Sequence, residues 1–209
     1  NLTKRFGGVT AVDKVTFQVR VGDIVSLIGP NGAGKTTLFN CLTGLYVPEE
    51  GSVCFGPSQM VLNRLYPYQI TSRGIARTFQ TIRLFKNMTA LDNVMVGAHS
   101  KMRAGFFGAL LRPRWVRLEE AKTKKHAHEL LNFLGLGSKA KTFAKNLPYG
   151  HQRKLEIARA LASDPKLLLL DEPAAGMNPK EKEELLELIR AIRNRGVTVL
   201  LIDHDMKVV

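Results

Sequence analysis

The sequence predicts an α/β fold with a largely parallel sheet. Short apolar runs typical of buried strands alternate with stretches of helical pattern, as in βαβ units. A glycine-rich loop at residues 29–37 lies between one such run and a helix. Residues 88–164 are predicted to be helical throughout and interrupt the alternation. We therefore expect a core formed by residues 1–87 and 165–209, with a helical subdomain formed by residues 88–164 inserted in it.

The chain before the glycine-rich loop is predicted to form strands. Residues 2–6 are expected to be the tail of a strand, and a two-glycine turn follows. Residues 15–21 alternate apolar and polar side chains, which predicts a half-buried strand. The apolar run at residues 23–28 predicts a buried strand that leads into the loop. Phe6 is either a core residue or an aromatic ring that stacks on a purine, and its position alone leaves both interpretations open.

The glycine-rich loop predicts a phosphate-binding site. It matches the pattern G-x-x-x-x-G-K-[ST] at Gly29, Gly34, Lys35 and Thr36. Glycines let successive backbone N–H groups point inward, and the N-terminus of the following helix adds a partial positive charge. Lys35 can then reach the β- and γ-phosphates, and the Thr36 hydroxyl can hold Mg²⁺. A glycine-rich turn with a surface lysine is the alternative, which the flanking strand and helix disfavour.

The middle of the chain is expected to leave the sheet and enter the helical region. Residues 52–55 predict a short strand, residues 57–72 are expected to be irregular, and residues 74–80 predict a buried strand that ends in Gln80. Within the helical region, Thr89 can cap a helix and residues 119–134 form another.

Residues 101–117 combine basic residues with aromatic and leucine side chains. This amphipathic insert can lie against a membrane surface or a membrane partner, or it can form a hairpin packed on its own domain. We favour the hairpin slightly.

The last third of the chain is predicted to return to the sheet. Residues 147–152 introduce a helix that runs to Ala162, with a proline suited to its first turn. Residues 166–172 predict a fully buried strand that ends in two carboxylates. A helix at residues 180–195 and a buried strand at residues 197–202 complete the pattern.

Polar side chains follow three of the predicted strands, at Gln80, at Asp171-Glu172 and at His204. Because the carboxyl ends of parallel strands meet at the ligand crevice, we expect these side chains to lie near the phosphate loop. Asp171 can join the Mg²⁺ shell, Glu172 can accept a proton from an attacking water, His204 can contact the γ-phosphate, and Gln80 can touch both metal and water. The set predicts nucleotide hydrolysis.

Composition narrows the classes of protein. The 209 residues carry a formal net charge of +13 at pH 7, and the basic residues are scattered along the chain. We rank three interpretations of this charge: a solvated surface first, a function close to a membrane second, and nucleic-acid binding third. The two cysteines form no C-x-x-C pair, charged residues interrupt any signal peptide, and no apolar run is long enough for a membrane span. We expect a protein that is soluble when isolated.

In order along the chain, these motifs resemble the ATP-binding subunit of ABC transporters, over essentially all 209 residues. Residues 29–37 resemble the Walker A loop, Gln80 the Q-loop glutamine, and residues 147–161 the signature segment. Residues 168–171 resemble Walker B, followed by the catalytic Glu172, the D-loop at residues 174–179 and the switch His204. The resemblance implies a P-loop ATPase core with a mostly parallel sheet, an N-terminal antiparallel β subdomain and the inserted helical subdomain.

The resemblance also implies roles for individual residues in a Mg²⁺-dependent ATPase. Catalysis would involve Lys35, Gln80, Glu172 and His204, and Mg²⁺ would be held by Thr36, Gln80 and Asp171. ATP would be contacted by Phe6, Val12, Gly29, Asn31, Gly32, Ala33, Gly34, Lys35, Thr36 and Thr37 of one copy, and by Pro148, Tyr149, Gly150 and His151 of a second copy. The two copies would close head to tail around ATP.

The signature segment departs from the usual L-S-G-G-Q of the family, because this chain has Leu147-Pro148-Tyr149-Gly150-His151. Pro148 lacks the serine hydroxyl that would bind the γ-phosphate, and it also lacks an N–H group. The contact must then rely on Gly150 and the neighbouring N–H groups at the helix start.

The tyrosine in the signature, residues 172–179 and the basic insert together resemble the branch that serves branched-chain amino-acid importers, with urea or amide importers as similar alternatives. That branch implies a homodimer or a dimer with a related ATPase subunit, integral membrane permease subunits and, indirectly, a solute-binding protein. It implies a peripheral location on the cytoplasmic face of the plasma membrane, and a longer chain beyond both ends.

Two other classes of protein compete with this interpretation. A non-transport ABC ATPase that acts on ribosomes or nucleic acid usually has two linked cassettes or long coiled-coil inserts, which this sequence lacks. A small-molecule kinase or GTPase shares the phosphate loop but has no signature helix, and no N-K-x-D guanine motif is present. We therefore expect no nucleic-acid partner.

Overall fold

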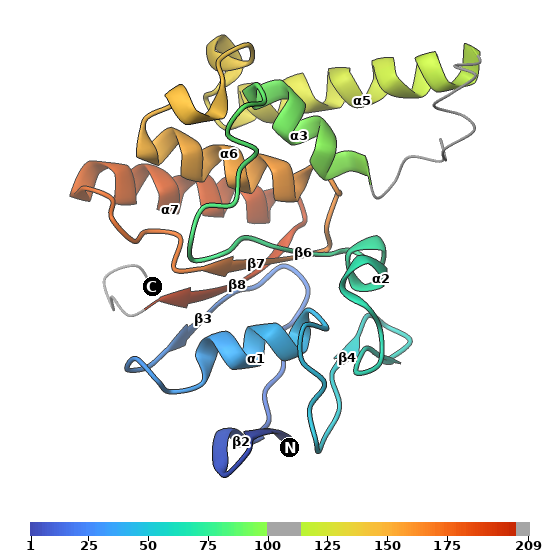
Figure 1. Cartoon of the computed structure of the whole chain (residues 1–209), viewed down its shortest axis with the longest axis vertical. Helices are drawn as coiled ribbons and strands as arrows, with labels where there is room; N and C mark the ends of the chain where they lie inside the picture. Colours follow the sequence, from blue (N-terminus) through green and yellow to red (C-terminus); the bar gives the residue numbers. More distant parts are fainter. Residues whose placement is uncertain (100–113, 204–209) are drawn as a thin grey trace.

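The computed structural model describes residues 1–99 and 114–203 (Figure 1). Its centre is a sheet of four parallel strands in the order β3-β8-β7-β6, which confirms the predicted α/β fold. The strands are β3 (Ile24–Ile28), β6 (Ile75–Arg77), β7 (Leu167–Asp171) and β8 (Thr198–Asp203). In β7 and β8 every residue except Leu167 is buried, as expected for parallel strands covered on both faces.

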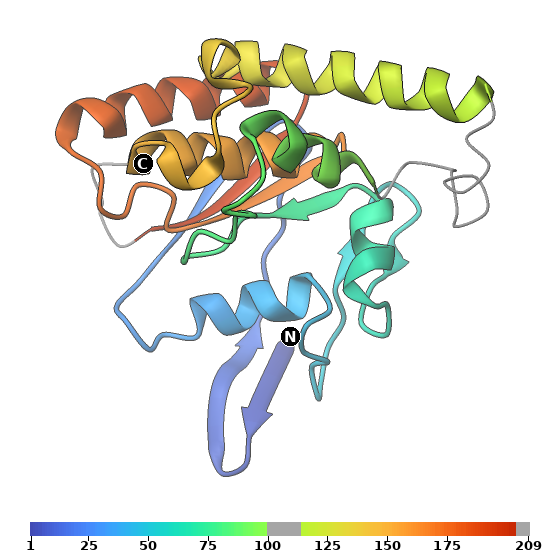
Figure 2. The same cartoon turned by 45° about the horizontal axis from the view of Figure 1, so that its top comes forward.

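Helices cover both faces of this sheet. Helix α1 (Lys35–Leu42) lies on one face, and α6 (Tyr149–Leu161) and α7 (Pro179–Asn194) lie on the other (Figures 1 and 2). Asn178 caps α7 by accepting a hydrogen bond from the Glu181 N–H at 2.9 Å. The parallel register joins β3 to β8 and β8 to β7, so the carboxyl ends of these strands lie at one edge.

The N-terminal part forms a small antiparallel hairpin of β1 (Leu2–Phe6) and β2 (Val9–Val15) beside α1 (Figure 2). The expected strand at residues 15–21 is wrong, because β2 already ends at Val15. Val15 lies opposite Leu2, the first residue of β1, so the hairpin offers no neighbour to the residues that follow. Val21 is accordingly 93% exposed.

The segment between α1 and β6 is more regular than expected. Strands β4 (Cys54–Phe55) and β5 (Met60–Val61) pair with each other, and α2 (Pro67–Ser72) lies within the stretch expected to be irregular. A proline in its first turn suits the start of this short helix. Strand β6 ends at Arg77, so Gln80 lies just beyond the strand rather than at its last position.

The described part of residues 88–164 contains helices and no strand. Besides α6 it holds α3 (Ala90–Ala98), α5 (Arg114–Phe133) and the 3₁₀ turns η2 (Gly137–Lys139) and η3 (Ala144–Asn146). Thr89 caps α3 as expected, accepting a bond from the Asp92 N–H at 3.1 Å. Residues 101–113 of the basic insert lie outside the described residues, and α5 begins before the expected residue 119. The division at residues 88 and 164 stays a prediction, since one hydrophobic core joins α3, α5 and α6 to β7, β8 and α7.

None of the described helices is both long enough and apolar enough to cross a membrane.

Candidate active site

The phosphate loop follows β3 and ends at α1, in the order predicted. Gly32 and Gly34 adopt left-handed φ values of 83° and 82°, which favour glycine. At Gly34 a Cβ atom would lie 2.0 Å from the backbone oxygen of Ala11, because β2 passes directly beside the loop. Val12, an expected ATP contact, is buried at this crossing. Elsewhere in the loop, Asn31, Gly32, Ala33 and Thr36 are exposed.

Lys35 folds back along the loop. Its Nζ donates hydrogen bonds to the carbonyl oxygens of Gly29 at 2.6 Å and Pro30 at 2.9 Å. No acidic residue occupies the first turn of α1, so the positive end of the helix dipole is not offset there. Free backbone N–H groups, an ammonium group and a helix N-terminus are the groups that suit an anion, so phosphate binding by this loop stays a prediction.

Two carboxylates stand side by side in different surroundings at the end of β7. Asp171 is the last residue of the strand and is buried, whereas Glu172 follows it with a left-handed φ of 46° and is partly exposed. Gln80 Nε2 donates a hydrogen bond to Glu172 Oε2 at 2.9 Å. The structure thus brings together Gln80 and Glu172, which are 92 residues apart in sequence.

The donor set fits a magnesium ion. Asp171 Oδ1 is buried without a hydrogen-bond partner among the described residues, while Oδ2 is paired with Arg77. A carboxylate oxygen and a hydroxyl are the hard ligands that Mg²⁺ prefers, directly or through its water shell. Asp171 and Thr36 could therefore hold the ion that accompanies a nucleoside triphosphate in the loop.

The signature segment forms the start of α6. Pro148 is the N-cap residue and makes no side-chain cap, so the N–H groups of Tyr149, Gly150 and His151 open the helix. Gly150 is closely approached from α7, since a Cβ atom there would lie 2.7 Å from Glu181 Oε1. Within residues 1–99 and 114–203, no hydrogen bond or ion pair joins this segment to the phosphate loop.

A buried ion pair that the sequence analysis missed connects α6 to Gln80. Arg153 and Glu156 are 0% and 1% exposed and lie 2.9 Å apart. Arg153 donates to the backbone oxygens of Phe79 at 2.7 Å and Gln80 at 2.8 Å, and Glu156 accepts from the backbone N–H of Arg83 at 3.3 Å. We call these two residues and the segment 79–83 the α6 clamp. The sequence did carry one indication of this ion pair: Arg153 and Glu156 have opposite charges and lie one helical turn apart on an otherwise apolar face of the helix.

Phe6 and His204 are the remaining residues of the predicted site. Phe6 is 44% exposed, and its ring meets Tyr46 edge-on with the ring centroids 5.1 Å apart. His204 lies outside the described residues. Stacking by Phe6 and a phosphate contact by His204 stay predictions.

The cysteines add nothing to this site. Cys41 lies on α1, and burial raises the pKa of its thiol. No group of three or more potential metal-ligating side chains of the His, Cys, Asp and Glu types occurs in the described part of the chain.

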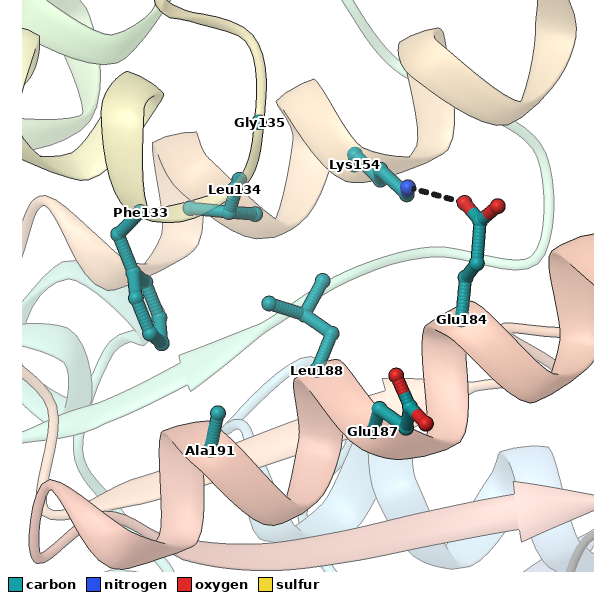
Figure 3. A pocket seen from close by; sticks show the side chains of 8 residues that line it. All are labelled: Phe133, Leu134, Gly135, Lys154, Glu184, Glu187, Leu188 and Ala191. Atoms are coloured by element: carbon teal, nitrogen blue, oxygen red, sulfur yellow. Dashed lines mark hydrogen bonds and ion pairs between the residues drawn. The ribbon is translucent and has the colours of Figure 1, made fainter.

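A separate groove lies between the end of α5, α6 and α7 (Figure 3). Leu134 and Leu188 point into it, and Lys154 bridges to Glu184 at 2.9 Å, a hydrogen bond that lowers the pKa of Glu184. None of its lining residues belongs to the predicted site.

A family model described as ABC transporter matches residues 12–175. The chain belongs to this family and is one of its ATP-binding cassettes. It is 48% identical over 209 residues to the high-affinity branched-chain amino acid transport ATP-binding protein LivG of Salmonella typhimurium, covering all of this chain and 81% of that protein. It is 46% identical, again over the full chain and 81% of the relative, to BraF of Pseudomonas aeruginosa, which carries the same description.

Solved ABC cassettes share the fold. One cassette in its ADP conformation superposes with a TM-score of 0.85 and 34% identity, covering 100% of this chain and 80% of that one. A dimeric cassette in a post-hydrolysis state, bound to ADP and phosphate, gives a TM-score of 0.79 and 29% identity over 99% of this chain and 86% of the other.

Proposed function

We propose that the chain is the ATP-hydrolysing subunit of an importer for branched-chain amino acids. The observation that carries the ATPase assignment is the meeting of Gln80 and Glu172 beside the orphaned oxygen of Asp171. In this proposal Glu172, Gln80 and Asp171 supply the general base, an amide and the metal carboxylate, at or beyond the carboxyl ends of strands in the same sheet as β3, which the phosphate loop follows. We infer the transported solute from the descriptions of the LivG and BraF relatives, which match over the whole chain.

The chain's residues would act mainly by positioning and charge neutralisation. Lys35 and the loop N–H groups bind the β- and γ-phosphates, and Glu172 accepts the proton of the attacking water. Gln80 orients Glu172, to which it already donates a hydrogen bond. Bound magnesium, held by Asp171 and Thr36, would neutralise charge on the phosphate oxygens.

Two copies would close head to tail, each ATP lying between one phosphate loop and the partner's signature segment. Closure adds contacts from the N–H groups of Tyr149, Gly150 and His151 that exist only in the dimer, so ATP shifts the population toward it. The partners would be an identical or related ATPase subunit, membrane permease subunits and, through these, a solute-binding protein. The location would be the cytoplasmic face of the plasma membrane.

Purified protein tests the ATPase directly. Release of phosphate from ATP is expected to require Mg²⁺, and Lys35→Ala is expected to weaken nucleotide binding at least about tenfold through the lost charge-assisted bonds. Lys180→Ala, on the exposed start of α7, is the matched control. Unchanged nucleotide affinity in Lys35→Ala would contradict the site.

The transport assignment needs a different experiment. Affinity capture of the tagged full-length protein from gently solubilised native cells should recover polytopic permease subunits, encoded beside a solute-binding protein for branched-chain amino acids. If the solute-binding protein encoded beside them is specific for urea or amides, the transported solute would be assigned as urea or an amide instead. Recovery of ribosomal or DNA-associated proteins alone would overturn transport while leaving the ATPase intact.

A further inference from the structure

We propose that Arg77 is a positioning residue for the magnesium carboxylate. Its guanidinium group holds one oxygen of Asp171 and leaves the other oxygen available to the metal shell. The inference rests on the proposed function, because it requires that Asp171 serves bound Mg²⁺ and ATP.

The geometry around Asp171 is asymmetric. Arg77 Nη2 lies 2.8 Å from Asp171 Oδ2, and the two side chains are only 6% and 2% exposed. Asp171 Oδ1 is buried as well, yet it has no partner among the described residues. One carboxylate oxygen is thus fixed by a charge-assisted hydrogen bond, and the other is left with unused acceptor capacity.

The same guanidinium group reaches the phosphate-loop helix. Arg77 Nη1 donates to Asn40 Oδ1 at 2.6 Å and to Thr43 Oγ1 at 3.3 Å, and both acceptors belong to α1 or its C-cap. The guanidinium carbon also lies 5.5 Å from the ring centroid of Phe39 and 5.1 Å from that of Phe79. Arg77 therefore connects α1 to β7, the two elements that carry the proposed metal ligands.

Burial makes this partner necessary. A carboxylate removed from water is unstable unless it is paired and hydrogen-bonded, so a buried Asp171 without a counter-ion would turn away from its present position. Arg77 keeps Asp171 paired and oriented before the metal arrives. Lysine could supply the charge, but its single ammonium point cannot span Asp171 and Asn40 as the planar guanidinium fork does.

The positioning role predicts in which direction the metal's contribution to nucleotide binding changes when Arg77 is removed. If Arg77 positions Asp171, its removal weakens the contribution of the metal to nucleotide binding. If Arg77 acted only as a nearby positive charge, its removal would make the site more negative and would strengthen that contribution. The two cases differ in direction.

The experiment measures the dissociation constant of a fluorescent, non-hydrolysable ATP analogue in EDTA and in Mg²⁺. The ratio of the two constants is the metal gain, and it does not depend on turnover. Arg77→Met should reduce the metal gain about tenfold, which corresponds to about 1.4 kcal/mol, with the constant in EDTA changed less than about twofold. Arg77→Lys should fall between Arg77→Met and the wild type. Arg193→Met, on the exposed end of α7, is the control and should keep the full gain.

Each outcome bears on the proposal. An unchanged or increased metal gain in folded Arg77→Met overturns it while leaving the ATPase assignment in place. If Arg77→Met fails to fold by circular dichroism, Asn40→Ala decides, because it removes one of the contacts that Arg77 makes with α1 and should lower the gain about threefold. Failure of the wild type to bind the analogue would instead overturn the proposed function itself.

Discussion

At the scale of single residues, the two carboxylates at the end of β7 differ in burial and in partner. Asp171 is enclosed and paired with Arg77, while Glu172 is turned out of the strand by its left-handed backbone and meets Gln80. A non-glycine residue with positive φ costs free energy, and such strain clusters at functional sites. The turn lets adjacent residues serve different partners, because Asp171 meets Arg77 in the core and Glu172 meets Gln80 outside it.

We expect Glu172→Gln to lower the rate of ATP hydrolysis at least about 100-fold, because a glutamine cannot accept the proton of the attacking water. Nucleotide affinity should stay the same, since the phosphate loop is untouched. Phosphate release and nucleotide titration measure the two effects. Glu183→Gln, at an exposed position of α7, should behave as the wild type. Wild-type turnover in Glu172→Gln would remove Glu172 from the mechanism.

Glu49 predicts a pH dependence of local stability. The hydrogen bond from Lys4, at 2.6 Å, and then that from the Arg5 N–H lower the pKa of Glu49. A carboxylate whose folded pKa is depressed stabilises the fold above its unfolded pKa, and the contribution is lost as pH falls through the folded value. The difference in unfolding free energy between wild type and Glu49→Gln should therefore be largest near neutral pH. It should vanish in strong acid, and a difference that grew on acidification would contradict the assignment.

The residues that sequence alone could predict are those whose role is local. Gly34, Lys35 and Thr36 could be assigned to a phosphate loop because the loop is one short segment, whose own backbone conformation and side chains create the predicted site. Arg77 and Arg153 could not be assigned, because the partners that tie them to the site lie far away in sequence. Asp171 is 94 residues from Arg77, and the backbone oxygen of Gln80 is 73 residues from Arg153. The strand expected at residues 15–21 failed for a related reason: alternation predicts a face to bury but does not supply a pairing neighbour.

At the scale of elements, the α6 clamp ties the signature helix to the Q-loop segment. Arg153 supplies donors to two backbone oxygens, and Glu156 supplies acceptors to backbone N–H groups. Because these groups belong to an irregular segment, they have no ladder partners to replace the clamp. A displacement of α6 must therefore either carry Gln80 with it or break buried hydrogen bonds.

We expect Arg153→Met to destabilise the fold by about 3–5 kcal/mol, because Glu156 is left buried without a counter-ion. The double variant Arg153→Met, Glu156→Met should recover much of that loss, since an apolar pair of similar size needs no charge partner. In both variants the amides of residues 79–83 should exchange faster with solvent. Chemical denaturation and hydrogen exchange measure these effects, with Arg190→Met as an exposed control. Unchanged exchange in the folded double variant would show that the clamp does not hold the loop.

At the scale of the whole molecule, the proposed ATP half-sites come from segments that no described hydrogen bond connects within one chain. An ATP molecule bound between two copies of the chain would contact both kinds of segment, one from each copy. We expect ATP to shift Glu172→Gln from monomer toward dimer, because the bonds that the γ-phosphate makes to the second copy persist when hydrolysis is blocked. ADP should not produce the shift. Size-exclusion chromatography with light scattering measures the shift from monomer to dimer. Equal dimerisation with ADP would contradict the proposal that the γ-phosphate drives closure of the dimer.

The order of strands in the sheet has a consequence for synthesis of the chain. Strand β8 lies between β3 and β7, so residues 198–203 are the last described part of the chain to emerge from the ribosome and yet occupy the middle of the sheet. Until then β3 and β7 have unpaired edges, which are prone to wrong pairing. Nascent chains arrested before residue 198 should be sensitive to protease across β3 and β7, and chains extended until residue 203 has cleared the exit tunnel should become resistant. The sheet beside the nucleotide site would thus be completed only after residue 203 has emerged.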